Sequence, residues 1–125
     1  RARALADTAR TARLKPVGVF RDEQPRELVR AAQELGLSAV QLHGAEPANV
    51  VAEVRNGFDG EIWTAGFEDR CGDRLVFDSP GGGTGRPCDW QAVAEHPAKG
   101  SAFLAGGIGP DNARAAQATG VYGLD

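Results

Sequence analysis

Three ionisable side chains stand directly after short apolar runs of the kind that form buried strands. His43, Asp78 and Asp125 each occupy such a position, and parallel α/β sheets bind ligands at the carboxyl ends of their strands. Asp78 could act as a general acid or base, and His43 could bind a substrate or transfer a proton. A turn aspartate and a hydrogen-bonded structural histidine fit the same spacing about as well. The residue types alone leave both roles open.

Glycines gather after two of the same runs. Gly106, Gly107 and Gly109 precede Pro110, which could open a helix whose unpaired amides and dipole would attract a phosphate. A tight turn without a ligand is the simpler interpretation. The stretch Gly81–Gly85 lacks the Gly-Lys-Ser/Thr ending of a P-loop, so we expect a surface loop there and no nucleoside triphosphate site.

The elements that would position these residues alternate along the chain. Apolar residues at helical spacing, together with proline and glycine at the expected ends, predict five helices. We expect them from Ala2 to a point before Pro16, at Pro25–Leu35, at Pro47–Asn56, from the Asp89 cap through Glu95, and from Pro110 to Gly120. Short apolar runs predict six strands buried on both faces. They are Lys15–Phe20, Ser38–His43, Glu61–Gly66, Arg74–Ser79, Ser101–Ala105 and Val121–Asp125.

Strands that alternate with helices indicate βαβ units, and therefore an α/β fold with a parallel sheet. One connection departs from this pattern, because Phe67–Asp73 is too short to hold an ordinary crossover helix. It could be a bare loop that returns the chain to the other end of the sheet. It could also be a hairpin, or a place where residues are missing from the sequence.

The composition limits the class of protein. The chain has 125 residues, 42% of them hydrophobic and 25% charged, as expected of one globular domain over residues 1–125. A net charge of −3 argues against a nucleic-acid partner, and the apolar runs are too short to span a membrane. Cys71 and Cys88 stand outside any paired motif, so we expect a reducing compartment and no metal site. Because the sequence begins and stops inside expected elements, we expect a segment of a longer chain.

Five groups of residues follow one another in a specific order. They are Lys15–Phe20, Ala39–Gly44 with Glu46, Phe77-Asp78-Ser79, Gly82–Gly85 with Asp89-Trp90, and Leu104–Ile108 with Pro110-Asp111-Asn112. In this order they resemble the phosphoribosylanthranilate isomerase family of tryptophan biosynthesis, and the resemblance covers nearly the whole chain. The combination of Gln-Leu-His-Gly with Gly-Gly-Thr-Gly is its most specific part.

The resemblance implies a (βα)8 TIM barrel, of which this chain would form an incomplete portion with about six parallel strands, the third to the eighth. It implies conversion of N-(5-phosphoribosyl)anthranilate to 1-(2-carboxyphenylamino)-1-deoxyribulose 5-phosphate by an Amadori rearrangement, without a cofactor. Asp78 matches the general acid that protonates the ribose ring oxygen. Gly106 and Gly107 match one half of the phosphate site, and His43 and Asp125 match substrate-binding residues at the rim.

The sequence departs from the family's pattern at the general base. The family uses a cysteine in a Lys-x-Cys-Gly motif, which is absent from these residues, and neither Cys71 nor Cys88 matches it. The helix after the fifth barrel strand is missing at Phe67–Asp73, and six strands would leave Lys15–Phe20 and Val121–Asp125 as open edges. We therefore expect the 125 residues to be inactive on their own.

The resemblance also implies a small phosphoribosyl substrate, a cytoplasmic location and possible fusion or association with indole-glycerol-phosphate synthase. Two other functions stay open. A barrel relative without the base could bind a sugar phosphate and not turn it over, and a different ribose-phosphate isomerase could share the fold. The segment Gln41-Leu42-His43-Gly44 favours the anthranilate-type enzyme over the latter.

Overall fold

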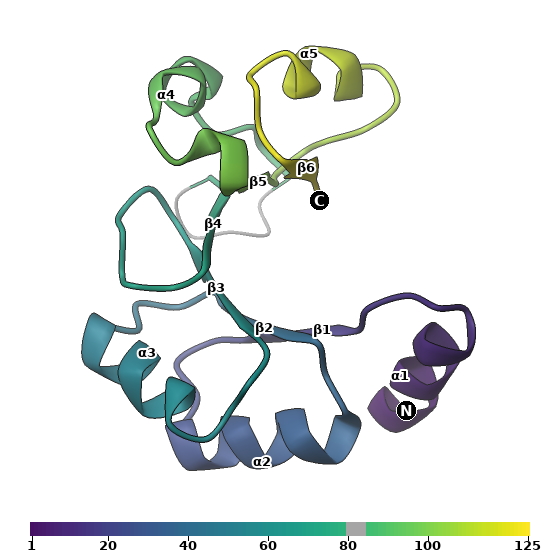
Figure 1. Cartoon of the computed structure of the whole chain (residues 1–125). Helices are drawn as coiled ribbons and strands as arrows, with labels where there is room; N and C mark the ends of the chain where they lie inside the picture. The colour runs from purple at the N-terminus through teal and green to yellow at the C-terminus, as the bar shows by residue number, and fades with distance from the viewer. Residues whose placement is uncertain (80–84) are drawn as a thin grey trace. The chain divides into compact units, whose positions relative to one another are not determined.

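The computed structural model describes residues 1–79 and 85–125, in which helices and strands alternate as the sequence predicts (Figure 1). The helices are α1 (Ala2–Thr11), α2 (Pro25–Leu35), α3 (Ala48–Arg55), α4 (Trp90–Glu95) and α5 (Ala113–Gln117), with a 3₁₀ turn η1 (Lys99–Ser101). The strands are β1 (Val17–Phe20), β2 (Ala39–Leu42), β3 (Glu61–Ala65), β4 (Arg74–Phe77), β5 (Phe103–Leu104) and β6 (Gly123–Leu124). All of the expected loop Gly81–Gly85 except Gly85 lies outside the described residues.

The six strands form one sheet, in which their order follows the chain from β1 to β6. The pairs β1–β2, β4–β5 and β5–β6 are parallel, with Val17 opposite Ala39 and Phe103 opposite both Val76 and Gly123. The expected α/β class with six parallel strands is confirmed. At the two ends of this order, β1 and β6 each pair with one strand among the described residues, as expected of open edges.

The short connection between β3 and β4 is a bare loop. The Asp73 N–H donates to the Ile62 carbonyl at the start of both strands, at 2.7 Å, and the Gly66 N–H donates to the Val76 carbonyl near their ends, at 2.9 Å. The start of β3 is therefore bonded to the start of β4, and the end of β3 to the end of β4. Strands paired in this way are parallel, so the connection is not a hairpin. The structure describes every residue of this connection and shows no helix in it, so the expected loss of a helix at Phe67–Asp73 is confirmed.

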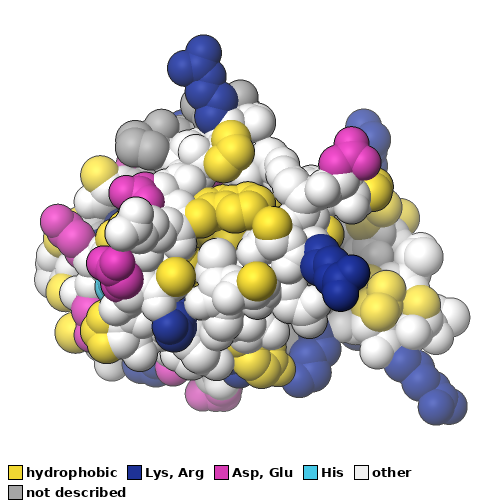
Figure 2. Space-filling view, turned by 90° about the horizontal axis from the view of Figure 1, so that it is seen from above, with side chains coloured by type: hydrophobic (Ala, Val, Ile, Leu, Met, Phe, Trp, Pro, Cys, Tyr) yellow, Lys and Arg dark blue, Asp and Glu magenta, His cyan; other side chains and the backbone are white. Residues whose placement is uncertain are grey.

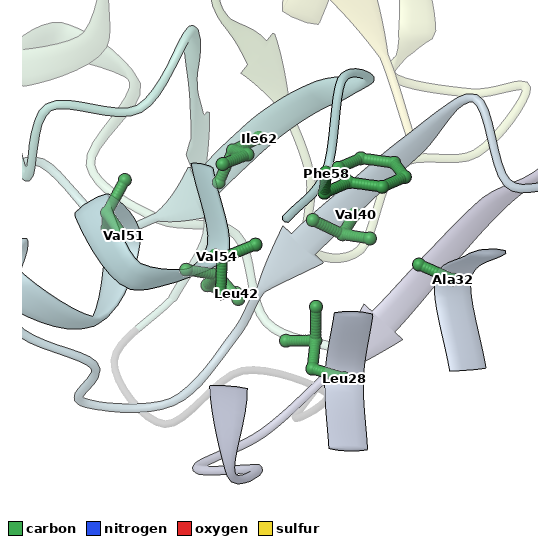
Figure 3. Packing of buried hydrophobic residues seen from close by; sticks show 8 residues of the cluster. All are labelled: Leu28, Ala32, Val40, Leu42, Val51, Val54, Phe58 and Ile62. Atoms are coloured by element: carbon green, nitrogen blue, oxygen red, sulfur yellow. The ribbon is translucent and has the colours of Figure 1, made fainter. Parts of the chain in front are cut away.

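The chain divides into two compact units, of which the first contains Arg1–Trp63 and Arg70–Asp73. Its hydrophobic core packs α2 and α3 against the strands (Figure 3). The buried members are Leu28, Ala32, Val40, Leu42, Val51, Val54, Phe58 and Ile62. Since side chains alternate between the two faces of a strand, Val40 and Leu42 face this core, and Gln41 and His43 belong to the opposite face of β2.

The second unit contains Thr64–Asp69 and Arg74–Asp125. Its buried core combines strand residues with residues of α4 and α5, namely Leu75, Phe77, Val93, Ala102, Leu104 and Ala116. Asp89 caps α4 as the sequence predicts, because its carboxylate accepts the N–H groups of Gln91 and Ala92. His96 follows α4 and contacts the Phe77 ring, with the ring centroids 5.0 Å apart.

Two expectations about these elements are wrong. Strand β1 is not buried on both faces, since Val17 is 37% and Val19 is 63% exposed, and both residues of β6 are only partly buried. The reason is the place of these two strands at the ends of the strand order. The last helix begins at Ala113 and not at Pro110. Residues 110–112 form a turn in which Asn112 Oδ1 accepts the Gly109 N–H at 2.8 Å, and such local bonds compete with the helical ladder.

Acidic and basic side chains both occur on the face that Figure 2 shows, with hydrophobic side chains between them. This mixture agrees with the small net charge of −3. In residues 1–79 and 85–125, no helix is both long and apolar enough to cross a membrane.

Candidate active site

The loops after β1 and β2 meet at one buried carboxylate. Glu46 Oε1 accepts the Asp22 N–H at 2.8 Å, and Glu46 Oε2 accepts the Gly44 N–H at 2.9 Å. Asp22 Oδ1 in turn accepts the Ala45 N–H at 2.9 Å. This network holds Asp22 at φ +52°, a conformation that few non-glycine residues adopt. Gly44 suits the site because a Cβ there would lie 2.3 Å from Asp22 Oδ1.

Arg70 reaches the loop after β2 from the bare connection between β3 and β4. Its Nη1 donates to the carbonyl oxygens of Gly44, at 3.1 Å, and Glu46, at 2.9 Å. The same nitrogen lies 3.6 Å from Glu46 Oε2, and the side chains of Arg70 and Glu46 are only 14% and 3% exposed. Arg70 could not be recognised from the sequence, because a single arginine in a loop carries no local signal of its partner.

His43 lies directly before this network, at the carboxyl end of β2 where the sequence predicts it. Its N–H donates to the Phe20 carbonyl at 2.8 Å and so continues the ladder between β1 and β2. The ring is half-buried, and its Nδ1 lies 2.8 Å from Gln41 Nε2. The position of His43 is therefore fixed both at its backbone and at its ring.

Asp78 follows β4 in the second unit and belongs to a closely packed turn. Its Oδ1 accepts the Ser79 N–H at 2.6 Å and the Ser79 hydroxyl at 3.4 Å. A Cβ on Gly106 would lie 2.6 Å from the same oxygen. The glycine turn after β5 thus passes directly beside the Asp78 carboxylate, and the structure brings these two predicted site residues together.

The two central glycines of this turn are required by its own geometry. Gly106 and Gly107 have φ of +89° and +65°, which glycine adopts far more readily than other residues. A Cβ on Gly107 would also lie 2.6 Å from the Gly85 carbonyl oxygen. Asn112 Nδ2 closes the turn by donating to the Gly107 carbonyl at 2.9 Å. Helix α5 begins only at Ala113, so its N-terminus does not lie directly after these glycines as the sequence predicts.

Cys88 lies near Asp78, and the pKa of its thiol is raised above the ordinary value. Burial raises the pKa of this thiol, and the negative charges of Asp78 and Asp89 add to the effect, while a backbone hydrogen bond opposes it. A thiol with a raised pKa is a poor base and a poor nucleophile near neutral pH. Cys71 is exposed and belongs to the first unit.

Asp125 follows β6, where it is exposed, and its N–H donates to the Leu104 carbonyl at 2.9 Å. Asp125 therefore belongs to the second unit with Asp78 and the glycine turn, whereas His43 belongs to the first. Within the part of the chain that the structure describes, no group of three His, Cys, Asp or Glu side chains could hold a metal ion.

Comparison with known sequences finds one family across the chain. The family model of N-(5'phosphoribosyl)anthranilate (PRA) isomerase matches residues 2–125. The tryptophan biosynthesis protein TrpCF of Yersinia pestis is 39% identical over 122 residues, which cover 90% of this chain and 26% of that protein. The N-(5'-phosphoribosyl)anthranilate isomerase of Deinococcus radiodurans is 37% identical over 115 residues, which cover 82% of this chain and 55% of that protein. The chain thus spans only about a quarter and about half of these relatives' lengths.

Comparison with solved structures gives the same fold. The crystal structure of phosphoribosyl anthranilate isomerase from Thermus thermophilus matches with a TM-score of 0.85 at 30% sequence identity. The match covers 99% of this chain and 66% of the Thermus chain. The expected fold, an incomplete portion of the isomerase fold, is therefore confirmed.

Proposed function

The chain belongs to the N-(5'-phosphoribosyl)anthranilate isomerase family, and we propose that it supplies the general acid and one half of the phosphate site of such an isomerase. The observation that carries the proposal is the family match over residues 2–125. The position of Asp78 beside the Gly106 turn supports it, because an acid and an anion-binding turn then lie side by side. The reaction is the Amadori rearrangement of N-(5-phosphoribosyl)anthranilate to its 1-deoxyribulose phosphate.

In this mechanism Asp78 gives a proton to the ribose ring oxygen. The C1′–O bond then breaks, the ring opens, and the anthranilate nitrogen becomes an iminium. Removal of the C2′ proton gives an enolamine, which relaxes to the ketone. The two bonds from Ser79 to Asp78 Oδ1 support this role, since they fix the plane of the carboxyl group and thus the direction of its other oxygen.

The substrate contacts are proposed along the same strand ends. We assign the phosphate to the turn at Gly106 and Gly107, where successive backbone amides can bind an anion. We assign contacts with the rest of the substrate to His43 and Asp125. The hydrogen bonds of Glu46 and Arg70 support the assignment of His43, because they hold Gly44, the residue that follows it.

The base that removes the C2′ proton is proposed to lie in the remainder of the whole protein. Cys88 is unsuited to that role because burial raises the pKa of its thiol. Cys71 stands on the bare loop and lacks the motif in which the family's base occurs. Because the acid would then lie in this chain and the base outside it, we expect the 125 residues alone to be inactive.

We further propose that the whole protein is a cytoplasmic enzyme in which these residues belong to one barrel domain. A second domain with indole-glycerol-phosphate synthase activity is compatible with the relatives. The chain covers only 26% of TrpCF from Yersinia pestis, so a large part of that relative lies outside the match.

An assay of the whole protein beside the 125-residue chain tests the proposal. Both are incubated with N-(5-phosphoribosyl)anthranilate, and the rearranged product is measured by chromatography. We expect turnover by the whole protein only. A folded whole protein that binds the product in calorimetry but shows no turnover would contradict the isomerase and favour the non-catalytic binder.

A further inference from the structure

Gln41 and His43 stand two positions apart on β2 and its end, so their side chains share the face of the strand that is turned away from the helices. Gln41 is a polar residue with only 4% of its surface exposed. Its amide nitrogen Nε2 lies 2.8 Å from His43 Nδ1. An amide NH₂ group can only donate, so with the Gln41 amide in this orientation Nδ1 is the acceptor and carries no proton.

We propose that Gln41 fixes the neutral His43 ring as the Nε2–H tautomer and thereby makes His43 a hydrogen-bond donor and not a proton acceptor. In neutral imidazole one nitrogen carries the proton and the other carries the lone pair. The contact with Gln41 occupies the lone pair of Nδ1, and the proton therefore belongs to Nε2. Gln41 is a positioning residue, because it acts through His43.

The backbone around His43 makes this arrangement rigid. The His43 N–H is bonded to Phe20, while the Gly44 N–H is bonded to Glu46 and the Gly44 carbonyl to Arg70. The peptide units on both sides of His43 are thus held by neighbouring loops. The ring retains only its side-chain torsions, and the bond from Gln41 restricts these.

The tautomer stands on this geometry, whereas its consequence for catalysis rests on the proposed function. In the isomerase, a neutral His43 of this form offers an N–H to an oxygen of the substrate. It cannot accept the C2′ proton, because neither ring nitrogen has a lone pair to spare. The structure thus separates His43 from the base that the mechanism still needs.

The ring nitrogens can be observed directly by long-range ¹H–¹⁵N correlation of the ¹⁵N-labelled 125-residue chain at a pH where the rings are neutral. The chain has two histidines, so two sets of signals suffice. We expect His43 to show a protonated Nε2 and an unprotonated Nδ1. A proton on Nδ1 would overturn the proposal. His96 is an internal reference, since its Nδ1 accepts the Ala98 N–H at 3.1 Å.

Substitution of Gln41 tests the cause. Gln41→Glu replaces the donor with a carboxylate that accepts, so we expect the His43 proton to move to Nδ1. Gln41→Met removes the donor at similar size, and should shift the Nδ1 signal to that of a nitrogen without a hydrogen bond. Gln33→Glu is the matched control, because Gln33 is an exposed residue of α2 that donates to the Gly57 carbonyl; it should leave the His43 signals unchanged.

Unchanged His43 signals in both Gln41 variants would overturn the role of Gln41. The spectra need no substrate. A whole protein that lacks isomerase activity would therefore contradict the proposed function and leave the tautomer unaffected. A proton on His43 Nδ1 in an active whole protein would contradict the tautomer and leave the proposed function unaffected.

Discussion

At Asp78 the change of a single atom tests proton transfer. Asp78→Asn keeps the oxygen that can accept the Ser79 N–H but has no acidic proton to give. We expect kcat/KM of the whole protein to fall by about 10²–10⁴-fold, the usual contribution of a positioned proton donor. The control is Asp89→Asn, because Asp89 caps α4 and asparagine caps a helix about as well. Equal activity of the two variants would remove Asp78 from the acid role.

Glu46 is expected to contribute stability through its two accepted N–H groups. Glu46→Gln turns one acceptor into a donor that faces a backbone N–H in a buried site. We expect the free energy of unfolding, measured in urea, to fall by about 1–3 kcal/mol. Glu27→Gln is the control, since the Glu27–Arg30 pair is exposed and should cost less than about 1 kcal/mol. Equal losses would mean that the buried network adds nothing beyond a surface pair.

Cys88 should react more slowly than Cys71 with iodoacetamide at pH about 8, near the ordinary pKa of a thiol. Cys71 is exposed, while burial raises the pKa of Cys88 and keeps it protonated. Peptide mass spectrometry measures both rates, which should converge in urea.

The raised pKa of Cys88 also means that the folded state holds the thiol proton more tightly than the unfolded chain does. Its contribution to stability is therefore complete below the ordinary thiol pKa and is lost as the pH rises through the raised value. Equal rates in the folded protein would contradict the burial of Cys88.

The positions of His43 and Asp78 could be predicted from the sequence, because each follows an apolar run whose length and boundaries are typical of a strand. Their partners could not. Glu46 and Arg70 are polar residues whose roles depend on contacts with segments far away in the sequence, and the role of Gln41 depends on how its amide meets the His43 ring. No local pattern distinguishes such residues from ordinary surface side chains.

Among the elements, helix α2 ends at a residue that must adopt a left-handed backbone. Gly36 has φ +60° and its N–H bonds to carbonyls of the last helical turn. Gly36→Ala should lower the free energy of unfolding by about 1–2 kcal/mol, the cost of this conformation for other residues. Gly100→Ala is the control, because a Cβ added there would meet open space; it should change stability by less than about 0.5 kcal/mol. A loss at Gly36 no larger than at Gly100 would contradict the left-handed end.

All six strands and all five helices were predictable as elements, because their periodicity and their proline and glycine boundaries agree. The wrong expectations concern where a helix begins and how far a strand is buried. The helix α5 starts late, since the side chain of Asn112 bonds backbone groups of the glycine turn. The exposure of β1 depends on which strands stand next to it, and an apolar run does not contain that information.

For the whole molecule, the exposed strand β1 predicts association. Val19 is 63% exposed on this strand, and open strand edges pair with other chains. We expect the 125-residue chain to self-associate in sedimentation equilibrium and Val19→Lys to shift it towards monomer. Leu5→Lys is the matched control, because Leu5 is 64% exposed on α1 and not on a strand. An equal effect of both variants would indicate general hydrophobic association and not edge pairing.

The bare loop between β3 and β4 also bears on how the sheet assembles in time. Ile62 and Asp73 are bonded although only 11 residues separate them, whereas Val17 and Ala39, or Val76 and Phe103, are about twice as far apart along the chain. The entropy lost in closing a loop grows by about 0.6 kcal/mol for each doubling of its length. Of these parallel pairings, the one between β3 and β4 should therefore form first, and it gives the remaining strands a template. Where a crossover helix would otherwise stand, we therefore expect the short loop to start the assembly of the sheet.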